Sequence, residues 1–103
     1  MSDTDENIKN LILGDVADDY EEFEHVVKTV ISEAAERGIP VDRQEIFDKL
    51  RELVKQGYVQ SFSYLANQNS FAKVAEYSAD RISEVWFYIT PKGLLIFKPS
   101  PEE

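Results

Sequence analysis

The pattern of apolar positions predicts a long amphipathic helix from Asp15 to Arg37. Asp15 is placed as its N-cap, because a short carboxylate side chain can accept hydrogen bonds from first-turn amides. Gly38 and Pro40 follow as a stop, since glycine allows the left-handed turn that ends a helix and proline cannot continue one. The apolar stripe of this predicted helix consists of Val16, Tyr20, Phe23, Val27, Val30, Ile31 and Ala34.

A second amphipathic helix is predicted from Asp42 to Gln56. Asp42 and Glu45 have the spacing of a capping box, in which each side chain accepts a hydrogen bond from the backbone amide of the other residue. Gly57 then permits the left-handed turn that ends the helix. Its buried stripe is expected to consist of Ile46, Phe47, Leu50, Leu53 and Val54. Because only a short extended segment joins the two helices, we expect them to pack on each other.

Two segments alternate between faces as strands do, Tyr58–Leu65 and Val85–Thr90. About twenty residues separate them, which is long for a hairpin connection, and their loosely helical spacing suggests a short helix near Ser70–Ala79. Two other apolar pieces remain. Residues Ile8–Leu13 fit either a helical turn or an edge strand, and Leu94–Phe97 is a last apolar run before two prolines.

The run from Asp42 to Gly93 resembles the second half of a winged-helix domain, as in regulators of the MarR and PadR types. The resemblance rests on a capped helix, then Gly57-Tyr58-Val59, then a strand from Trp86 that closes on a Thr-Pro-Lys-Gly turn. It covers about half of the chain and implies an α+β fold in which two main amphipathic helices pack on a small antiparallel β-hairpin sheet. The long helix over 15–37 fits a helix–helix–hairpin order more simply than a helix-turn-helix, whose first helix is short.

A chain of 103 residues is long enough for one domain with a single core. We expect a disordered acidic N-terminus over 1–7, a single winged-helix-like domain over 8–98 and a flexible C-terminal tail over 99–103. Cysteine is absent, which excludes a disulfide framework and a thiolate metal site. No apolar run approaches the ~18 residues that a membrane span needs, so we expect a cytoplasmic protein without a membrane partner.

The net charge of −9 is concentrated in the first part of the chain. Residues 1–37 carry eleven acidic and three basic side chains, whereas residues 38–103 carry nine acidic and eight basic ones. The field of the whole molecule therefore repels nucleic acid. The acidic residues expected near the start of the first long helix could meet a basic partner or simply complement the helix dipole, and they are Asp15, Asp18, Asp19, Glu21, Glu22 and Glu24.

Aromatic residues of the two strands are the main candidate site. If Val85, Phe87 and Ile89 face the helices, the residues between them face away, and cross-strand neighbours extend the same surface. The surface is expected to consist of Tyr58, Phe62, Tyr64, Trp86 and Tyr88. Exposed, it would anchor a protein partner or a second copy of the chain. Otherwise, it would be covered by Phe71, Ile82 or residues 94–97.

The alternative function is that of a DNA-binding transcriptional regulator, which the winged-helix resemblance implies. Its contacts to phosphates and bases would come from the second helix and the hairpin, with Arg43, Gln44, Lys49, Arg51, Lys55, Lys73 and Arg81. Acidic residues alternate with these cations on the helix, as Glu45, Asp48 and Glu52. Such a mixed face is typical of a solvated helix, so a non-enzymatic protein-interaction module is our first prediction.

Catalysis, cofactor binding and metal binding are not expected. The four glycines stand singly at element boundaries, so no glycine-rich loop could hold a phosphate. Glu21 and His25 lie one helical turn apart, but this single histidine and one carboxylate fall short of the three or four ligands that zinc takes. The pair is expected to stabilise the helix slightly.

Overall fold

The computed structural model describes the backbone of residues 3–74 and 79–98 and the side chains of residues 6–74 and 80–98. Over these ranges the chain is an α+β protein with one antiparallel sheet. In chain order the elements are α1 (Asp3–Asp15), β1 (Glu21–Glu22), α2 (Phe23–Glu36), α3 (Arg43–Lys55), β2 (Val59–Leu65), β3 (Ser70–Lys73), the 3-10 helix η1 (Ala79–Glu84), β4 (Val85–Ile89) and α4 (Pro91–Ile96). The tail expected over 99–103 lies outside the described residues.

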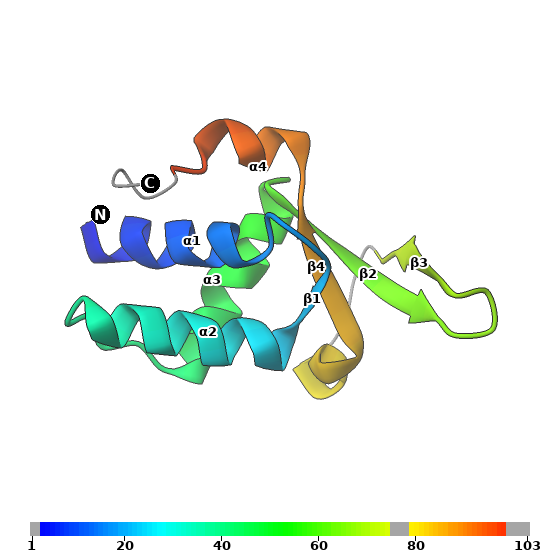
Figure 1. Ribbon diagram of the computed structural model, residues 1–103, viewed down its shortest axis with the longest axis horizontal. Coiled ribbons are helices and arrows are strands. Elements are labelled where there is room, and N and C mark those ends of the chain that lie inside the picture. Colours follow the sequence, from blue (N-terminus) through cyan, green and yellow to red (C-terminus); the bar gives the residue numbers. More distant parts are fainter. Residues whose placement is uncertain (1–2, 75–78, 99–103) are drawn as a thin grey trace.

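The sheet has the strand order β1-β4-β2-β3, and every neighbouring pair is antiparallel. Figure 1 shows α1, α2 and α3 gathered at one end of the molecule, while the β2–β3 hairpin projects away from them. α1 packs on both α2 and α3, and α3 also contacts β2. η1 leads into β4 and packs against α2.

Alternate residues of β4 point to opposite faces of the sheet. Val85, Phe87 and Ile89 are 5%, 0% and 4% exposed and join the core. Trp86 and Tyr88, between them, keep contact with solvent. The same core contains apolar side chains of the three long helices, namely Ile8, Leu11, Ile12, Leu13, Phe23, Val26, Val27, Val30, Ala34, Ile46, Leu50 and Leu53. Removal of this surface from water is the main stabilising term of the fold.

The prediction of one helix from Asp15 to Arg37 is wrong. α1 ends at Asp15, residues 16–20 form a loop, and the chain passes through β1 before α2 begins at Phe23. Val16 stays buried in the loop, and its carbonyl accepts a hydrogen bond of 3.0 Å from the Ile89 amide. Pairing with β4 thus replaces helical hydrogen bonding here. Asp15 closes a helix and does not cap the start of one.

The apolar run Ile8–Leu13 forms the middle of α1, so it is helical and not an edge strand. α1 begins at Asp3, within the residues 1–7 that were expected to be disordered. In the last turn of α1, the Phe97 ring would lie 3.1 Å from a Cβ added to Gly14, so glycine gives this ring room. One turn earlier, the Asn10 side-chain amide donates to the Lys98 carbonyl and accepts from the Lys98 amide, both at 2.8 Å. We call these contacts the α1 clasp.

The predicted boundaries between α2 and β2 are confirmed. Gly38 and Gly57 have φ of +73° and +85°, the left-handed conformation that ends a helix. At the start of α3, the Asp42 side chain accepts a hydrogen bond of 2.9 Å from the Glu45 amide. The link between α2 and α3 therefore runs only from Arg37 to Asp42.

The two predicted strands are confirmed as β2 and β4, but the short helix expected near Ser70–Ala79 is wrong over its first residues. Ser70–Lys73 forms β3, in which Phe71 pairs with Tyr64 across the hairpin. Beyond the strand, the Val74 amide donates to the Ser61 carbonyl at 2.9 Å. Cross-strand pairing of an aromatic residue outweighs weak helical spacing here. Residues 75–78 of the expected helix lie outside the described part of the chain.

The Thr-Pro-Lys-Gly segment, expected to be a closing turn, opens α4. The Thr90 hydroxyl accepts from the Gly93 amide at 3.0 Å as an N-cap and donates to the Gly57 carbonyl at 2.6 Å. The Lys92 ammonium group donates to the Gln56 carbonyl at 2.8 Å. A Cβ on Gly93 would lie 2.2 Å from the Tyr58 carbonyl oxygen. These contacts fix the end of α3 against the start of α4. They account for the presence of both the Gly57 stop and the Thr-Pro-Lys-Gly segment.

Candidate functional site

Six aromatic side chains gather on the face of the sheet opposite the core, and we call this surface the outer aromatic face. Antiparallel pairing places these side chains side by side, because Phe62 lies opposite Trp86 and Tyr64 lies opposite Phe71. Tyr88 follows on β4, and Tyr20 arrives from the loop before β1. Among the described residues, this face consists of Tyr20, Phe62, Tyr64, Phe71, Trp86 and Tyr88.

Tyr20 contacts three other rings of the outer aromatic face. Its ring stacks on Phe71 with a centroid distance of 3.9 Å and on Tyr88 at 5.1 Å. It meets the ring of Phe62 edge-on at 5.0 Å. Phe71 in turn contacts Trp86 at 5.4 Å. The edge-to-face contacts of Tyr20 with Phe62 and of Phe71 with Trp86 have the spacing that aromatic pairs prefer, and with the stacked contacts they hold the rings together.

None of the six side chains is fully buried. Five are half-buried, and Tyr64 is 41% exposed. The Tyr64 hydroxyl donates to the Asn69 side chain at the hairpin turn, at 2.5 Å. The face is thus partly closed by its own rings and still presents aromatic surface to solvent.

Four of the five aromatic residues predicted from the sequence lie on this face, and Tyr58 does not join their ring contacts among the described residues. Tyr58 precedes β2, packs on the core and lies under the Lys92 ammonium, 5.0 Å from its ring centroid. The sequence reasoning missed Tyr20, which it assigned to the long helix, and treated Phe71 only as a possible cover. Residues 70–73, Ser-Phe-Ala-Lys, show no clear alternation, so the sequence offered little sign that Phe71 belongs to a strand.

The other proposed covers lie elsewhere. Ile82 is 5% exposed in the core on the helix side. Leu94, Leu95 and Ile96 of α4 are 54%, 86% and 41% exposed. They form a second, aliphatic surface patch, in which Leu95 is the most exposed residue. Phe71 alone among the proposed covers contacts the outer aromatic face, as one of its members.

The surroundings of the outer aromatic face are acidic. Glu22 pairs with Trp86 and is exposed, and Asp18 and Asp19 are exposed just before Tyr20. Lys73, paired with Phe62, is exposed as a cation on β3. We call Asp18, Asp19 and Glu22 the acidic rim.

The residues named for DNA binding lie on three elements, and several already have partners within the chain. Arg43 pairs with Glu24 and lies over the Phe23 ring, and Gln44 donates to Asp48 at 3.1 Å. The remaining positions differ in exposure. On α3, the Arg51 guanidinium lies 5.8 Å from the centroid of the Phe47 ring, Lys55 is exposed and Lys49 is half-buried. Lys73 lies on β3. In η1, the Arg81 guanidinium pairs with the Glu84 carboxylate at 2.9 Å. Arg43 and Arg81 would have to leave these exposed ion pairs to bind a phosphate.

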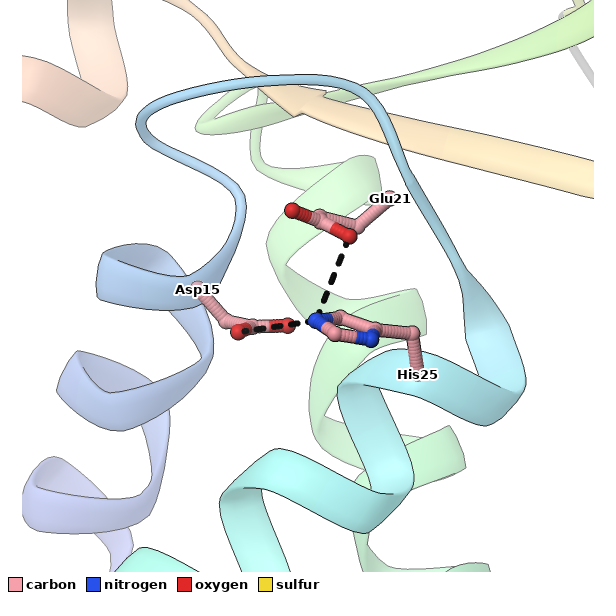
Figure 2. A group of neighbouring side chains, drawn as sticks. All are labelled: Asp15, Glu21 and His25. Carbon is pink, nitrogen blue, oxygen red and sulfur yellow. Dashed lines mark ion pairs between the residues drawn. The ribbon is translucent and has the colours of Figure 1, made fainter.

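A separate polar cluster lies on the helix side, where α1, β1 and α2 meet. Figure 2 shows the side chains of Asp15 and Glu21 pointing to the imidazole of His25. The His25 Nε2 atom lies 3.8 Å from Asp15 Oδ1 and 3.4 Å from Glu21 Oε1. Sequence reasoning paired Glu21 with His25 but missed Asp15, because it placed all three on one continuous helix.

Asp15 is the buried member of this cluster. Its side chain is 9% exposed, compared with 23% for Glu21 and 51% for His25. Burial raises the pKa of the Asp15 carboxyl to about 6, against 3.8 for an ordinary aspartate. His25 lowers that pKa, and the negative charges of Glu21 and Glu33 raise it further. A carboxylate placed here is thus short of positive neighbours.

None of the described helices is both long and apolar enough to cross a membrane. Comparison with protein-family models, with curated proteins and with solved structures gives no match to this chain.

Proposed function

We propose that this chain is a protein-interaction module of winged-helix type. Its outer aromatic face would bind an apolar segment of a partner protein that also carries lysine or arginine. The observation that carries the proposal is the gathering of six aromatic rings, none fully buried, on one face of the sheet.

The winged-helix part of the proposal is supported by the order of the elements. α3, the Gly57 stop and the β2–β3 hairpin follow one another as in the second half of such domains. The helix before α3 has 14 residues and is joined to it by residues 37–42, which is closer to a helix-turn-helix than the sequence suggested. This shorter α2 is the observation that favours the DNA-binding alternative.

Aromatic contacts support a docking role because they lower the cost of binding. Tyr20, Phe71 and Trp86 are already held by one another, so a partner would immobilise few additional rotamers. Trp and Tyr are also the residues that most often anchor protein interfaces. A partner's aliphatic side chain would bury the exposed parts of these rings.

The charges favour a protein over a nucleic acid. Aromatic sheet faces can stack nucleobases, but such sites combine the rings with a cationic groove that follows the phosphates. Here the acidic rim lies beside the rings, and Lys73 is the single charged residue between positions 58 and 74. A partner with lysine or arginine around an apolar anchor matches this arrangement.

The proposal can be tested with a displayed library of random peptides selected on the immobilised chain. We expect enriched peptides to combine aliphatic or aromatic residues with lysine or arginine. Binding of the synthesised peptides should change the fluorescence of Trp86, the only tryptophan. Their affinity should fall at least about tenfold in the Tyr64→Ser and Trp86→Ala variants, as expected for interface anchors.

Arg51→Glu with Lys55→Glu is the matched control, because both residues are exposed on α3, away from the outer aromatic face. Labelled random-sequence duplex DNA is titrated in parallel at about 50 mM salt, where phosphate contacts are strongest. Peptides that bind the aromatic variants as tightly as the wild type would contradict the proposal. DNA binding that is lost at about 200 mM salt and in the α3 control variant would favour the DNA-binding alternative.

A further inference from the structure

Asp15, Glu21 and His25 bring one imidazole and two carboxylates together from α1, β1 and α2. One donor atom from each residue lies within 4.8 Å of the other two. In the sequence these residues spread over eleven positions, and only the chain reversal between α1 and α2 joins them. We propose that they form a binding site for a divalent transition-metal ion, with Zn²⁺ as the best-matched ion.

The distances suit a zinc site. Bonds of about 2.1 Å in a tetrahedral zinc site separate neighbouring ligand atoms by about 3.4 Å. The distance between His25 Nε2 and Glu21 Oε1 is 3.4 Å, and that between His25 Nε2 and Asp15 Oδ1 is 3.8 Å. The carboxylate oxygens of Asp15 and Glu21 lie within 4.8 Å of each other, and rotation of these two side chains would bring all three ligand atoms to the tetrahedral spacing. A water molecule can take the fourth position, as in zinc sites with three protein ligands.

A second observation indicates a cation independently of these distances. Asp15 is nine-tenths buried, and its Oδ2 atom is buried without a hydrogen-bond partner among the described residues. Figure 2 shows this carboxylate pointing into the cluster. A buried carboxylate oxygen without a donor is unfavourable, and a bound metal ion supplies the missing positive charge. The raised pKa of Asp15 has the same physical origin.

The donor set selects the class of ion. An imidazole nitrogen suits Zn²⁺, Co²⁺, Ni²⁺ and Cu²⁺, whereas Ca²⁺ and Mg²⁺ take oxygen ligands. The negative charge of Glu33 faces Asp15 and adds to the attraction for a dication. The Thr29 hydroxyl lies 3.4 Å from His25 Nε2 and would give up this contact to the metal. The competing arrangement is a protonated His25 held between the two carboxylates, without metal.

The experiment is a calorimetric titration of Zn²⁺ into the full chain, after removal of metals, at about pH 7.5, where imidazole is mostly neutral. We expect one Zn²⁺ per chain and a rise in Tm on the order of 5 °C at saturating metal, because only the folded chain assembles the site. Since His25 is the only histidine, the NMR signals of its ring report directly on coordination. They should shift with Zn²⁺ and not with an equal concentration of Ca²⁺ or Mg²⁺.

His25→Ala and Glu21→Gln test the ligands, and Glu36→Gln is the matched control because Glu36 is exposed on the same helix. The two ligand variants should weaken Zn²⁺ binding at least about tenfold, as expected when zinc loses one of three protein ligands. The control should bind like the wild type. His25 is half exposed, so its replacement should leave the fold intact, which the Tm without metal checks.

Three results would overturn the site. One is the absence of both heat and a His25 shift with Zn²⁺ in excess over the protein. Another is undiminished affinity in the His25→Ala variant, which would place the ion on other acidic groups. The last is an equal response to Ca²⁺, which indicates attraction to the acidic surface in general. The metal site does not depend on the proposed function, since it lies on the helix side of the sheet and the outer aromatic face lies opposite.

Discussion

The two faces of the sheet are built by the same strands and serve different purposes. On the helix side, Val85, Phe87 and Ile89 are almost fully buried in the core, and β4 contacts α2 and α4. On the other side, Trp86 and Tyr88 are half-buried and contact the rings of Phe71 and Tyr20. A side chain that packs among helices stabilises the fold. A ring that packs on other rings keeps part of its surface exposed, and a partner could bury that surface. We therefore expect stability and binding to separate between alternate residues of one strand.

The largest expected effect tests this separation directly. Phe87→Ala removes a fully buried ring and should lower the free energy of unfolding by about 4 kcal/mol. Trp86→Ala, the next residue, removes a half-buried ring and should cost about 1–2 kcal/mol. Urea unfolding followed by circular dichroism measures both. Equal losses in the two variants would mean that the outer aromatic face is part of the core.

Gly93→Ala is the next largest. A Cβ at this position meets the Tyr58 carbonyl oxygen at 2.2 Å and Ile89 Cγ1 at 2.8 Å, so backbone must move. We expect a loss of about 3 kcal/mol, at the upper end of overpacking effects. Gly38→Ala is the matched comparison, because no atom lies within 4 Å and only its positive φ is unfavourable. It should cost about 1 kcal/mol. A mild Gly93→Ala phenotype would show that α4 can lift off the end of α3.

Asp15→Asn should stabilise the metal-free protein. The folded pKa of Asp15 is about 6 and its ordinary value is 3.8, so between these values the folded state holds the proton more tightly than the unfolded state. The free energy of unfolding therefore falls as the pH rises from about 4 to about 6. Above this window the ionised Asp15 carboxylate destabilises the folded state by its full amount. At about pH 7.5, Asn should raise the free energy of unfolding by about 1–2 kcal/mol, and at about pH 4 the two proteins should be nearly equal.

The measurement is urea unfolding of both proteins at several pH values, with a chelator present. A wild-type stability that stays flat between about pH 4 and pH 7 would show that the Asp15 carboxylate is already compensated in the folded chain. Glu36→Gln serves as the control for loss of an exposed carboxylate, and it should change neither the stability nor its pH dependence.

The smallest effect on stability is expected from Tyr64→Ser. Tyr64 is 41% exposed near the hairpin end, and its loss should change the free energy of unfolding by about 0.5–1 kcal/mol. Affinity for the selected peptides should nevertheless fall at least about tenfold. Leu95→Ser is the matched control, because Leu95 is 86% exposed on α4, and it should alter neither quantity. If Leu95→Ser reduces peptide affinity instead, the aliphatic patch of α4 is the docking surface.

The parts of the fold that were predictable from sequence are those with local causes. Asp42 caps α3, Gly57 ends it, and alternation gives β2 and β4, since each depends on residues within one turn or one strand. The loop over 16–20 was not predictable, because Val16 and Tyr20 kept helical spacing and the hydrogen bond that opposes the helix comes from Ile89. The same error hid the acid–histidine cluster and the place of Tyr20 on the outer aromatic face.

The α1 clasp has a consequence for the order in which the protein folds. Its two hydrogen bonds join Asn10 to Lys98, which are 88 positions apart, and the Phe97 ring closes over Gly14 beside them. During synthesis α1 leaves the ribosome before the elements that follow it, and this side of α1 can be covered only after residues 97 and 98 have been made. Contacts that bridge so long a loop form late, because their closure entropy is repaid only when the intervening chain is ordered. The α1 clasp should therefore slow unfolding and have little effect on the folding rate.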